Sequence, residues 1–299
     1  MLRRKQAGVG MGEAGRLALF KSGHFKNLVA KRVIDYVVSQ QNDDGGYAFC
    51  YGVDSNAQDT YYGLAILDLL GAPFPNFEKT VDWLRCFRPD GLYSHYYVAK
   101  ALELCDLDPK MEKKSLKKFV LSLPFFKGEF ENIDFNAEGP SKFLSVFMGI
   151  ELANMIDIEA DSEKIKGWIF SFKNNDGGFG ASGHSDLNST YHAVASLFNL
   201  GYQVTSLKDT LEYVRSCEKP YGGFTIVPDS STHFVEDVYY GTSALRLFGE
   251  SLRFPWQTSE FVLRCQNANG GFARSEIGIS TFEDTFYAVS VLKTISEQW

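Results

Sequence analysis

The chain lacks the cysteine motifs of zinc and redox proteins and the excess of basic residues found in nucleic-acid-binding proteins. Its 299 residues include five cysteines, and no two of them stand at the C-x-x-C spacing of zinc and redox motifs. The cysteines lie far apart, and Cys86, Cys217 and Cys265 each end an apolar helical pattern. We therefore expect buried free thiols rather than disulfides, which indicates a reducing, cytoplasmic compartment. The formal net charge of −7 provides no basic surface for nucleic acid or for anionic membranes.

Long apolar runs are also absent, and no segment approaches the roughly 20 residues that cross a bilayer. The basic start, Met1 to Gln6, is not followed by a continuous apolar stretch, which argues against a secretory signal peptide. A G-x-G-x-x-G match at residues 10–15 has no strand before it, so it does not predict a nucleotide site. We expect residues 1–24 to be a flexible lead-in and residues 25–299 to form a single domain.

Aromatic residues and a repeated pattern are what the sequence has in quantity. Four segments with helical apolar spacing end at a polar turn that contains two glycines and then an aromatic residue. These turns end at Tyr47, Phe179, Phe224 and Phe272. After each turn and its loop, a second helix opens on an Asp or Ser that is followed by an aromatic residue. Together with two degenerate copies, the openings lie at Asp59, Ser94, Lys142, Ser189, Asp237 and Asp284.

The spacing of these openings predicts the fold. The steps between them are 35, 48, 47, 48 and 47 residues, and self-similarity at such a period is typical of stacked supersecondary units. The second helices carry small residues such as Gly63, Ala193 and Gly241, which let helices crowd together in an inner layer. We therefore expect an all-α fold, an α6–α6 toroid built as a barrel of six helix hairpins around a central cavity.

The four Gly-Gly-aromatic turns, each followed by such a helix start, resemble the prenyltransferase and squalene-cyclase repeat family over roughly residues 26–299. Two branches of that family are relevant, the catalytic β subunits of protein prenyltransferases and the class II terpene cyclases. The resemblance implies a cavity that holds an isoprenoid lipid or a prenyl diphosphate. In the first branch it also implies a helical partner subunit.

The zinc site of the prenyltransferase branch carries over poorly. Similar enzymes bind zinc through an Asp-x-Cys at one inner-helix start and a His at the next. The matching residues are Asp237, Tyr239 and Asp284. The Asp is retained, but Tyr239 replaces the Cys and Asp284 replaces the His, which argues against zinc. Residues 225–236 lack the Arg and Lys that similar enzymes use on the diphosphate. Ser189 stands where the family has a diphosphate-binding His.

Two further residues follow from the resemblance. Lys142 falls where prenyltransferases carry an Arg at the lipid site, so it is a candidate for binding an anionic head group. Class II cyclases place an acid in an Asp-x-Asp-Asp-Thr motif at an inner helix. Here Val235–Val238 and Phe282–Thr285 are partial matches that put Glu236 and Glu283 at the acid position.

The residues themselves leave two interpretations of the carboxylates open. Asp59, Asp237 and Asp284 are equivalent, and they lie on neighbouring repeats once the ring closes. As helix N-caps, each would contribute about 1 kcal/mol. With Glu236 and Glu283 they would instead form an acidic cluster at the cavity mouth, which could share a proton or hold a divalent cation such as Mg²⁺. No cofactor is firmly implied.

The aromatic residues at the same helix starts would pack in the core in part, and in part form a wall suited to an apolar chain or a carbocation. They are Tyr61, Tyr62, Tyr191, His192, Tyr239, Tyr240, Phe286 and Tyr287. We predict an isoprenoid-handling enzyme with divergent, non-zinc catalytic residues. The catalytic candidates are Asp237, Asp284, Glu236 and Glu283, and the aromatic residues, Asp59 and Lys142 are candidates for substrate binding.

Two alternatives to this function remain. One is a non-catalytic toroid that binds a lipid or a peptide. The other is an α/α-barrel glycosidase, since such barrels also pair carboxylates with aromatic residues.

Overall fold

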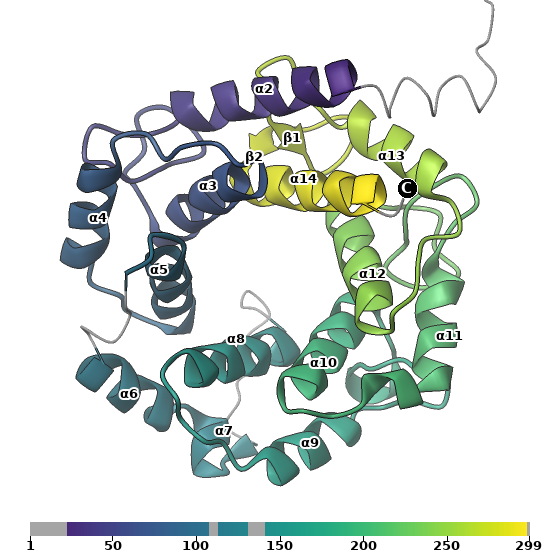
Figure 1. The fold of residues 1–299 in the computed structure, drawn as a ribbon. Coiled ribbons are helices and arrows are strands. Elements are labelled where there is room, and N and C mark those ends of the chain that lie inside the picture. The colour runs from purple at the N-terminus through teal and green to yellow at the C-terminus, as the bar shows by residue number, and fades with distance from the viewer. Residues whose placement is uncertain (1–22, 108–112, 131–140, 298–299) are drawn as a thin grey trace, which may run out of the picture.

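The structure, a computed structural model, describes residues 23–107, 113–130 and 141–297. It is a closed ring with two layers of helices, and Figure 1 shows the inner helices arranged around the ring axis with the outer helices behind them. The α6–α6 toroid predicted from the repeat is confirmed. The predicted lead-in and the G-x-G-x-x-G match fall on residues 1–22, outside the described residues.

The inner layer consists of six helices. Each begins at the end of the ring where the Gly-Gly-aromatic turns and the loops after them lie, which we call the loop end, and runs to the opposite end. They are α3 (Ala57–Leu69), α5 (Leu92–Leu104), α8 (Lys142–Met155), α10 (Leu187–Asn199), α12 (Val235–Leu247) and α14 (Phe282–Glu297). The outer layer contains α2 (Gly23–Ser39), α4 (Phe77–Cys86), α6 (Lys113–Ser122), the short α7 (Pro124–Lys127), α9 (Ser162–Phe170), α11 (Lys208–Cys217) and α13 (Pro255–Arg264).

The loops contain the remaining regular structure. Two 3₁₀ turns, η3 (Ala181–Gly183) and η4 (Val204–Ser206), lie before α10 and α11. The strands β1 (Phe272–Ala273) and β2 (Ser280–Thr281) pair antiparallel in front of α14, with Phe272 opposite Thr281. Within the described ranges, no helix combines the length and the apolarity needed to span a membrane.

The two layers differ in how much of each helix is buried. The inner helix α3 buries eight of its residues, from Ala57 to Leu67, whereas the outer helix α4 buries three. An outer helix needs one apolar stripe because its other face meets water, but an inner helix is covered on almost every side. The core of the protein therefore lies between the layers and within the inner barrel.

The Gly-Gly-aromatic turns join each repeat to the next one. Gly45 has φ +92°, and a Cβ atom there would lie 2.4 Å from the backbone carbon of Lys79 at the start of α4. The following Tyr47 is fully buried, and its N–H donates to Thr60 Oγ1 of α3 at 3.1 Å. Glycine at this position thus allows the turn to contact the next outer helix while its aromatic residue anchors the inner one.

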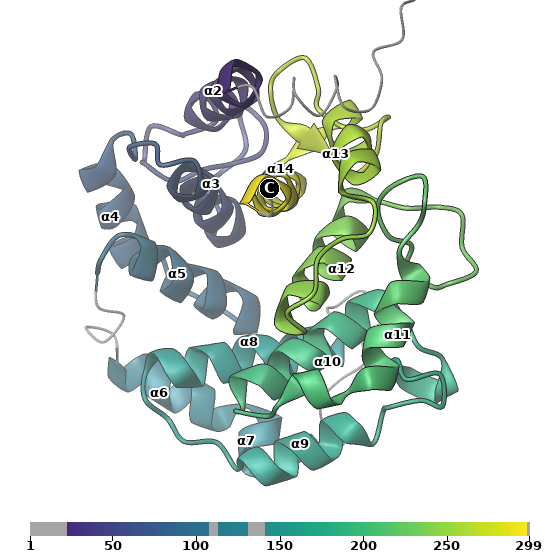
Figure 2. The same ribbon diagram turned by 45° about the vertical axis from the view of Figure 1, so that its right-hand side comes forward.

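The same contact closes the ring. Gly270, in the turn of the sixth repeat, would place a Cβ atom 2.1 Å from the carbonyl oxygen of Arg32 in α2. Arg32 Nη2 in turn donates to the carbonyl oxygen of Asn267 at 2.7 Å. Figures 1 and 2 both show α14 beside α3, so the last repeat packs on the first and the chain is not an open solenoid.

The cysteines are free thiols, as predicted, but not all of them are buried. Cys105, Cys217 and Cys265 are buried, Cys50 is half-buried and Cys86 is exposed. The prediction was wrong for Cys86. It ends the outer helix α4, where one face of the helix meets solvent.

Candidate functional site

A cavity of about 250 Å³ lies inside the inner barrel. Its size is just below the roughly 300–1,000 Å³ that is usual for ligand pockets. Eight tyrosines dominate its wall, and two carboxylates and one ammonium group also reach it. The lining residues are Tyr61, Tyr62, Tyr96, Tyr97, Lys100, Leu144, Phe147, Met148, Glu151, Tyr191, His192, Tyr239, Tyr240, Glu283, Phe286 and Tyr287.

Helix periodicity explains which residues reach the cavity. On α3, Tyr61 and Tyr62 lie two and three positions after Asp59, and the aromatic pairs of α5, α10, α12 and α14 have the same offset. Glu283 lies one position before Asp284, which is the residue of α14 that corresponds to Asp59. Lys100 lies six positions after Ser94, the corresponding residue of α5. Seven residues of helix separate these two levels, which makes the cavity about 10 Å deep.

The third repeat corrects the sequence alignment. On α8, Phe147 and Met148 take the places that tyrosine pairs take elsewhere, so Ser145 is the equivalent of Asp59. The spacing of the repeats had predicted Lys142 at this place. Lys142 is instead the first residue of α8, one turn earlier, and it does not line the cavity.

The tyrosine hydroxyls satisfy one another. Tyr240 and Tyr287 have their hydroxyl oxygens 3.2 Å apart, and those of Tyr62 and Tyr97 are 3.4 Å apart. The rings of Tyr239 and Tyr287 stack with centroids separated by 4.4 Å. Burial raises the pKa of Tyr62 and Tyr287 well above the ordinary value, so both remain neutral donors. These hydroxyls are therefore paired within the wall itself.

Glu283 is the carboxyl group at the loop end of the cavity. Its Oε1 accepts hydrogen bonds from Tyr62 at 3.1 Å and from Tyr287 at 2.9 Å. Within the described part of the chain, Oε2 has no hydrogen-bond partner. Burial raises the pKa of Glu283, and the two phenol donors act in the opposite direction. The group can thus hold a proton on Oε2, and the anion that remains after the proton leaves is stabilised.

A second charged group lies deeper in the cavity, and sequence reasoning missed it. Glu151 Oε2 accepts from the hydroxyl of Tyr96 at 2.6 Å and lies 3.8 Å from Lys100 Nζ. Lys100 is also 3.2 Å from Glu103. The signal was present in the sequence, because Lys100 and Glu151 are isolated charges within apolar stretches of inner helices. The position that Lys100 and Glu151 occupy in their repeats carries a small residue in the other repeats, such as Ala65 in the first.

His192 is a neutral wall residue. It is buried, and its Nδ1 lies 2.9 Å from the carbonyl oxygen of Asn188, so Nδ1 carries the hydrogen. Burial lowers the pKa of His192 to about 4. The imidazole therefore adds no positive charge to the cavity near neutral pH.

The three predicted aspartates do not line the cavity. Asp59 Oδ2 accepts from the backbone N–H of Phe49 at 3.0 Å. Asp237 Oδ2 accepts from the N–H of Phe234 at 3.0 Å, and Asp284 Oδ2 accepts from the hydroxyl of Thr281 at 2.7 Å. Each carboxylate thus holds the loop that precedes its own helix.

One of the two interpretations made these residues N-caps, but each is the third residue of its helix. Asn56 caps α3, and Phe234 is the N-cap of α12. Each helix begins two residues before the predicted start because the loop side chains and backbone take the capping position. At α12, Asp237 accepts from the backbone N–H of the N-cap Phe234, as the third residue does in a capping box.

Burial, rather than repulsion between the carboxylates, is the main cause of the raised pKa values of Asp59, Asp237 and Asp284. It raises the pKa of Asp237 to about 7, with a smaller contribution from Glu236, and Arg274 acts in the opposite direction. It also raises the pKa of Asp284. Glu236 is paired with Arg274 and does not line the cavity, so Glu283 is the one predicted catalytic candidate among the lining residues.

The donor set does not fit the zinc of the prenyltransferase branch. Two of the matching side chains, Asp237 and Asp284, bond to their own loops, and the third, Tyr239, is a phenol whose pKa is raised by burial. Within the described residues, no three His, Cys, Asp or Glu side chains gather so that they could hold a metal ion. The residues at these positions therefore do not form the zinc ligand set of that branch.

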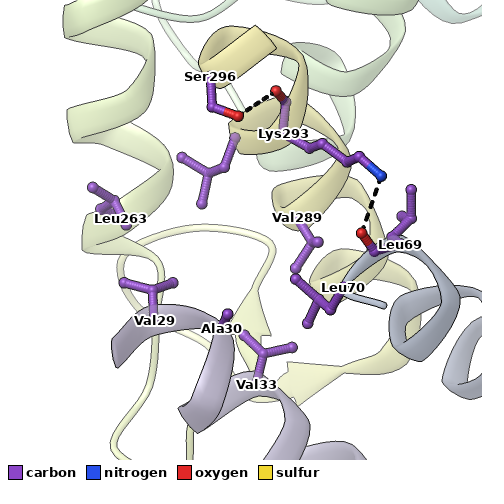
Figure 3. A pocket seen from close by; sticks show the side chains of 10 residues that line it. Val29, Ala30, Val33, Leu69, Leu70, Leu263, Val289, Lys293 and Ser296 are labelled. Carbon is purple, nitrogen blue, oxygen red and sulfur yellow. Dashed lines mark hydrogen bonds between the residues drawn. The ribbon is translucent and has the colours of Figure 1, made fainter. Parts of the chain in front are cut away.

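A second hollow, of about 240 Å³, lies outside the barrel between α2, α13 and the ends of α3 and α14. Figure 3 shows aliphatic side chains such as Val33 and Leu263 around it. Lys293 lies at its edge and donates to the carbonyl oxygen of Leu69 at 3.1 Å. The residues that line this hollow include no carboxyl group and no aromatic ring, so the central cavity is the candidate active site.

Comparison with known proteins matches this geometry to a family. The family described as the prenyltransferase alpha-alpha toroid domain matches residues 16–131 and 135–298. The chain is 24% identical over 204 residues to the geranylgeranyl transferase type-1 subunit beta of Arabidopsis thaliana. That match covers 63% of this chain and 54% of the relative, so the chain spans about half the length of that protein.

Two solved structures share the fold. Candida albicans protein geranylgeranyltransferase-I, solved in complex with GGPP, has a TM-score of 0.71 at 16% identity over 88% of this chain and 90% of that one. A variant of the type II terpene cyclase MstE from Scytonema has a TM-score of 0.58 at 9% identity over 95% of this chain and 98% of that one. At these identities the likeness establishes the toroid fold alone.

Proposed function

The chain belongs to the prenyltransferase alpha-alpha toroid family, and from that membership we propose that it is an enzyme that binds a prenyl chain in its tyrosine-lined central cavity and acts on it without zinc. The cavity wall supports this proposal. Aromatic rings suit an apolar polyene, and the hydroxyls of Tyr62, Tyr97, Tyr240 and Tyr287 are already paired with one another. The similar geranylgeranyltransferase-I was solved with GGPP. A family member with a comparable cavity is thus expected to hold an isoprenoid there.

Glu283 is the observation that carries the chemical part of the proposal. Its Oε1 accepts two phenol hydrogen bonds, while Oε2 faces no protein partner among the described residues. In the proposed step, the O–H bond at Oε2 breaks and its proton forms a C–H bond with an alkene of the substrate. The resulting carbocation lies against tyrosine faces, which attract positive charge. Loss of a proton from the product cation restores the acid.

The remaining predicted residues have supporting roles in this account. Asp284 follows Glu283 directly and fixes the start of α14 through Thr281, so it acts as a positioning residue. Asp59 and Asp237 hold the starts of α3 and α12 in the same way. Lys142 and Glu236 lie outside the lining, and the proposal gives them no role in the chemistry.

A prenyl-binding toroid without catalytic activity is the second candidate. The use of the three aspartates as loop anchors favours it, because those carboxylates are not free to react. A helical partner subunit stays part of either proposal, since the Arabidopsis relative is named a β subunit. Family membership argues against the glycosidase alternative.

Turnover of defined isoprenoids tests the proposal. The purified protein is incubated with C10 to C30 prenols and polyenes, and products and bound lipid are measured by mass spectrometry. Glu283→Gln keeps an oxygen that accepts from both tyrosines but has no transferable proton. We expect turnover to fall by at least about 100-fold while bound lipid persists. Glu276→Gln, an exposed carboxylate paired with Arg264, is the control.

Unchanged turnover in Glu283→Gln would overturn the assignment of this acid. If the wild type binds prenyl chains but converts none of them, the binding toroid is correct. If it binds no prenyl chain at all, both candidates fail.

A further inference from the structure

The cavity wall contains two carboxyl groups and one cation. Of the residues that line the cavity, Glu151 and Glu283 carry the carboxyl groups, Glu283 in the protonated form that the proposed function requires, and Lys100 is the cation. Lys100 Nζ is already 3.8 Å from Glu151 and 3.2 Å from Glu103. A ligand in the cavity therefore meets an ammonium group that is committed to two carboxylates, and a further carboxyl group at the loop end.

Helix N-termini ordinarily favour anions, and all six inner helices begin at the loop end of the barrel. In this chain, however, several of those helix starts carry acids of their own. Asp59 lies in the first turn of α3, Glu236 and Asp237 in that of α12, and Asp186 is the N-cap of α10. Asp186 accepts from the N–H of Ser189 at 2.7 Å. These carboxylates already occupy the positive ends of α3, α10 and α12 that a phosphate would otherwise use.

The cations near this end are occupied as well. Arg274 pairs with Glu236 and lies over the ring of Phe234, with its guanidinium carbon 4.0 Å from the ring centroid. Lys142, the first residue of α8, already takes part in an interaction of its own and does not line the cavity. A diphosphate at the cavity mouth would thus face carboxylates without an uncommitted basic partner among these residues.

The tyrosine wall has the opposite preference. Aromatic rings attract cations, and the wall contains eight tyrosine rings, several of whose hydroxyls bond to each other and to Glu151 and Glu283. We infer that the cavity accepts prenyl chains whose head group is uncharged or cationic and rejects prenyl diphosphates. The inference rests on the proposed binding of a prenyl chain in this cavity, and it names the substrate class.

Three ligands that differ only in the head group test the inference: farnesol, farnesyl diphosphate and farnesyltrimethylammonium. Their affinities for the full chain are measured by titration calorimetry below the concentrations at which they form micelles. We expect the ammonium ligand and the alcohol to bind at least about tenfold more tightly than the diphosphate, because like charges repel in a buried site. A diphosphate that binds as tightly as the alcohol would overturn the inference and leave the proposed function intact. If none of the three binds, the proposed function fails with it.

Charge variants identify the source of the selectivity. In Glu151→Gln/Glu283→Gln the wall keeps its hydrogen-bond acceptors and Lys100 becomes its remaining charge. We expect the affinity for the diphosphate, relative to the ammonium ligand, to rise at least about tenfold. Glu276→Gln, which removes one carboxylate charge on the exposed surface, should leave the order unchanged. If circular dichroism shows that the double variant is unfolded, Glu151→Gln alone is compared. An unchanged order in the folded variant would refute the role of these carboxylates.

Discussion

Tyr62 and Tyr287, on the first and the last inner helix of the ring, donate to the same carboxyl oxygen of Glu283, at 3.1 and 2.9 Å. The acid is therefore held by the contact that closes the toroid. Its environment depends on the whole ring, because α3 and α14 meet only when all repeats are in place. This relationship leads to the first prediction.

Tyr62→Phe and Tyr287→Phe should each weaken Glu283 as an acid. Each change removes one donor that stabilises the carboxylate, so the pKa of Glu283 rises further and proton donation becomes harder. A hydrogen bond to a charged group contributes about 1.5–3 kcal/mol, so turnover should fall roughly 10- to 100-fold. The alkaline limb of the pH–rate profile should move to higher pH, because the acid stays protonated longer.

Tyr97→Phe provides the matched control, since the Tyr97 hydroxyl contacts Tyr62 and not Glu283. A profile whose alkaline limb is the same in Tyr287→Phe and in wild type would show that Glu283 is not the acid. A purely structural role for the tyrosines would lower stability without this shift.

Asp237 should make stability depend on pH. Its pKa is raised to about 7 by burial, against 3.8 ordinarily. Between these values the folded state binds more protons than the unfolded state, so the contribution of Asp237 to the free energy of unfolding falls as pH rises from about 4 to about 7. Asp237→Asn mimics the neutral form and can still accept from Phe234. The variant should gain stability relative to wild type between pH 4 and pH 8.

Urea denaturation of both proteins across this pH range measures the difference. Other titrating groups, such as His192, contribute equally to the two proteins and cancel. A difference that does not vary with pH would mean that Asp237 ionises in the fold at its ordinary pKa.

The repeat made the fold predictable, whereas the orientation of individual side chains was not. A period near 47 residues and the four glycine turns specify stacked hairpins, and the small residues of the second helices identify the inner layer. The third repeat has no Asp and no tyrosine pair at its inner-helix start, so these two markers could not fix its register, and Lys142 was placed one turn too early.

The carboxylates show the same limit. Whether an acid at a helix start faces the cavity or its own loop depends on loop atoms such as the N–H of Phe234 and the hydroxyl of Thr281. Sequence spacing carries no information about those contacts. Glu283, one residue earlier on its helix than Asp284, faces the cavity because a single residue turns a helix by about 100°.

Ring closure should be sensitive to Gly270. A Cβ there would lie 2.1 Å from the backbone oxygen of Arg32, and the residue has φ +97°. Gly71 also has a positive φ, +64°, but no atom lies within 4 Å of the place a Cβ would take. Gly270→Ala should therefore lower the free energy of unfolding by about 1–3 kcal/mol more than Gly71→Ala. Equal losses in chemical denaturation would mean that the turn of the sixth repeat is not packed on α2.

Photoaffinity labelling tests the central claim, that a prenyl chain binds inside the barrel, most directly. A farnesol analogue with a diazirine at the far end of the chain is irradiated with the protein, and the labelled peptides are identified by mass spectrometry. We predict labels on the inner helices, at Tyr97, Phe147, Tyr239 or their neighbours in the cavity wall, and competition by unlabelled farnesol. Labels confined to the outer hollow, at Val33 and Leu263, would contradict the account.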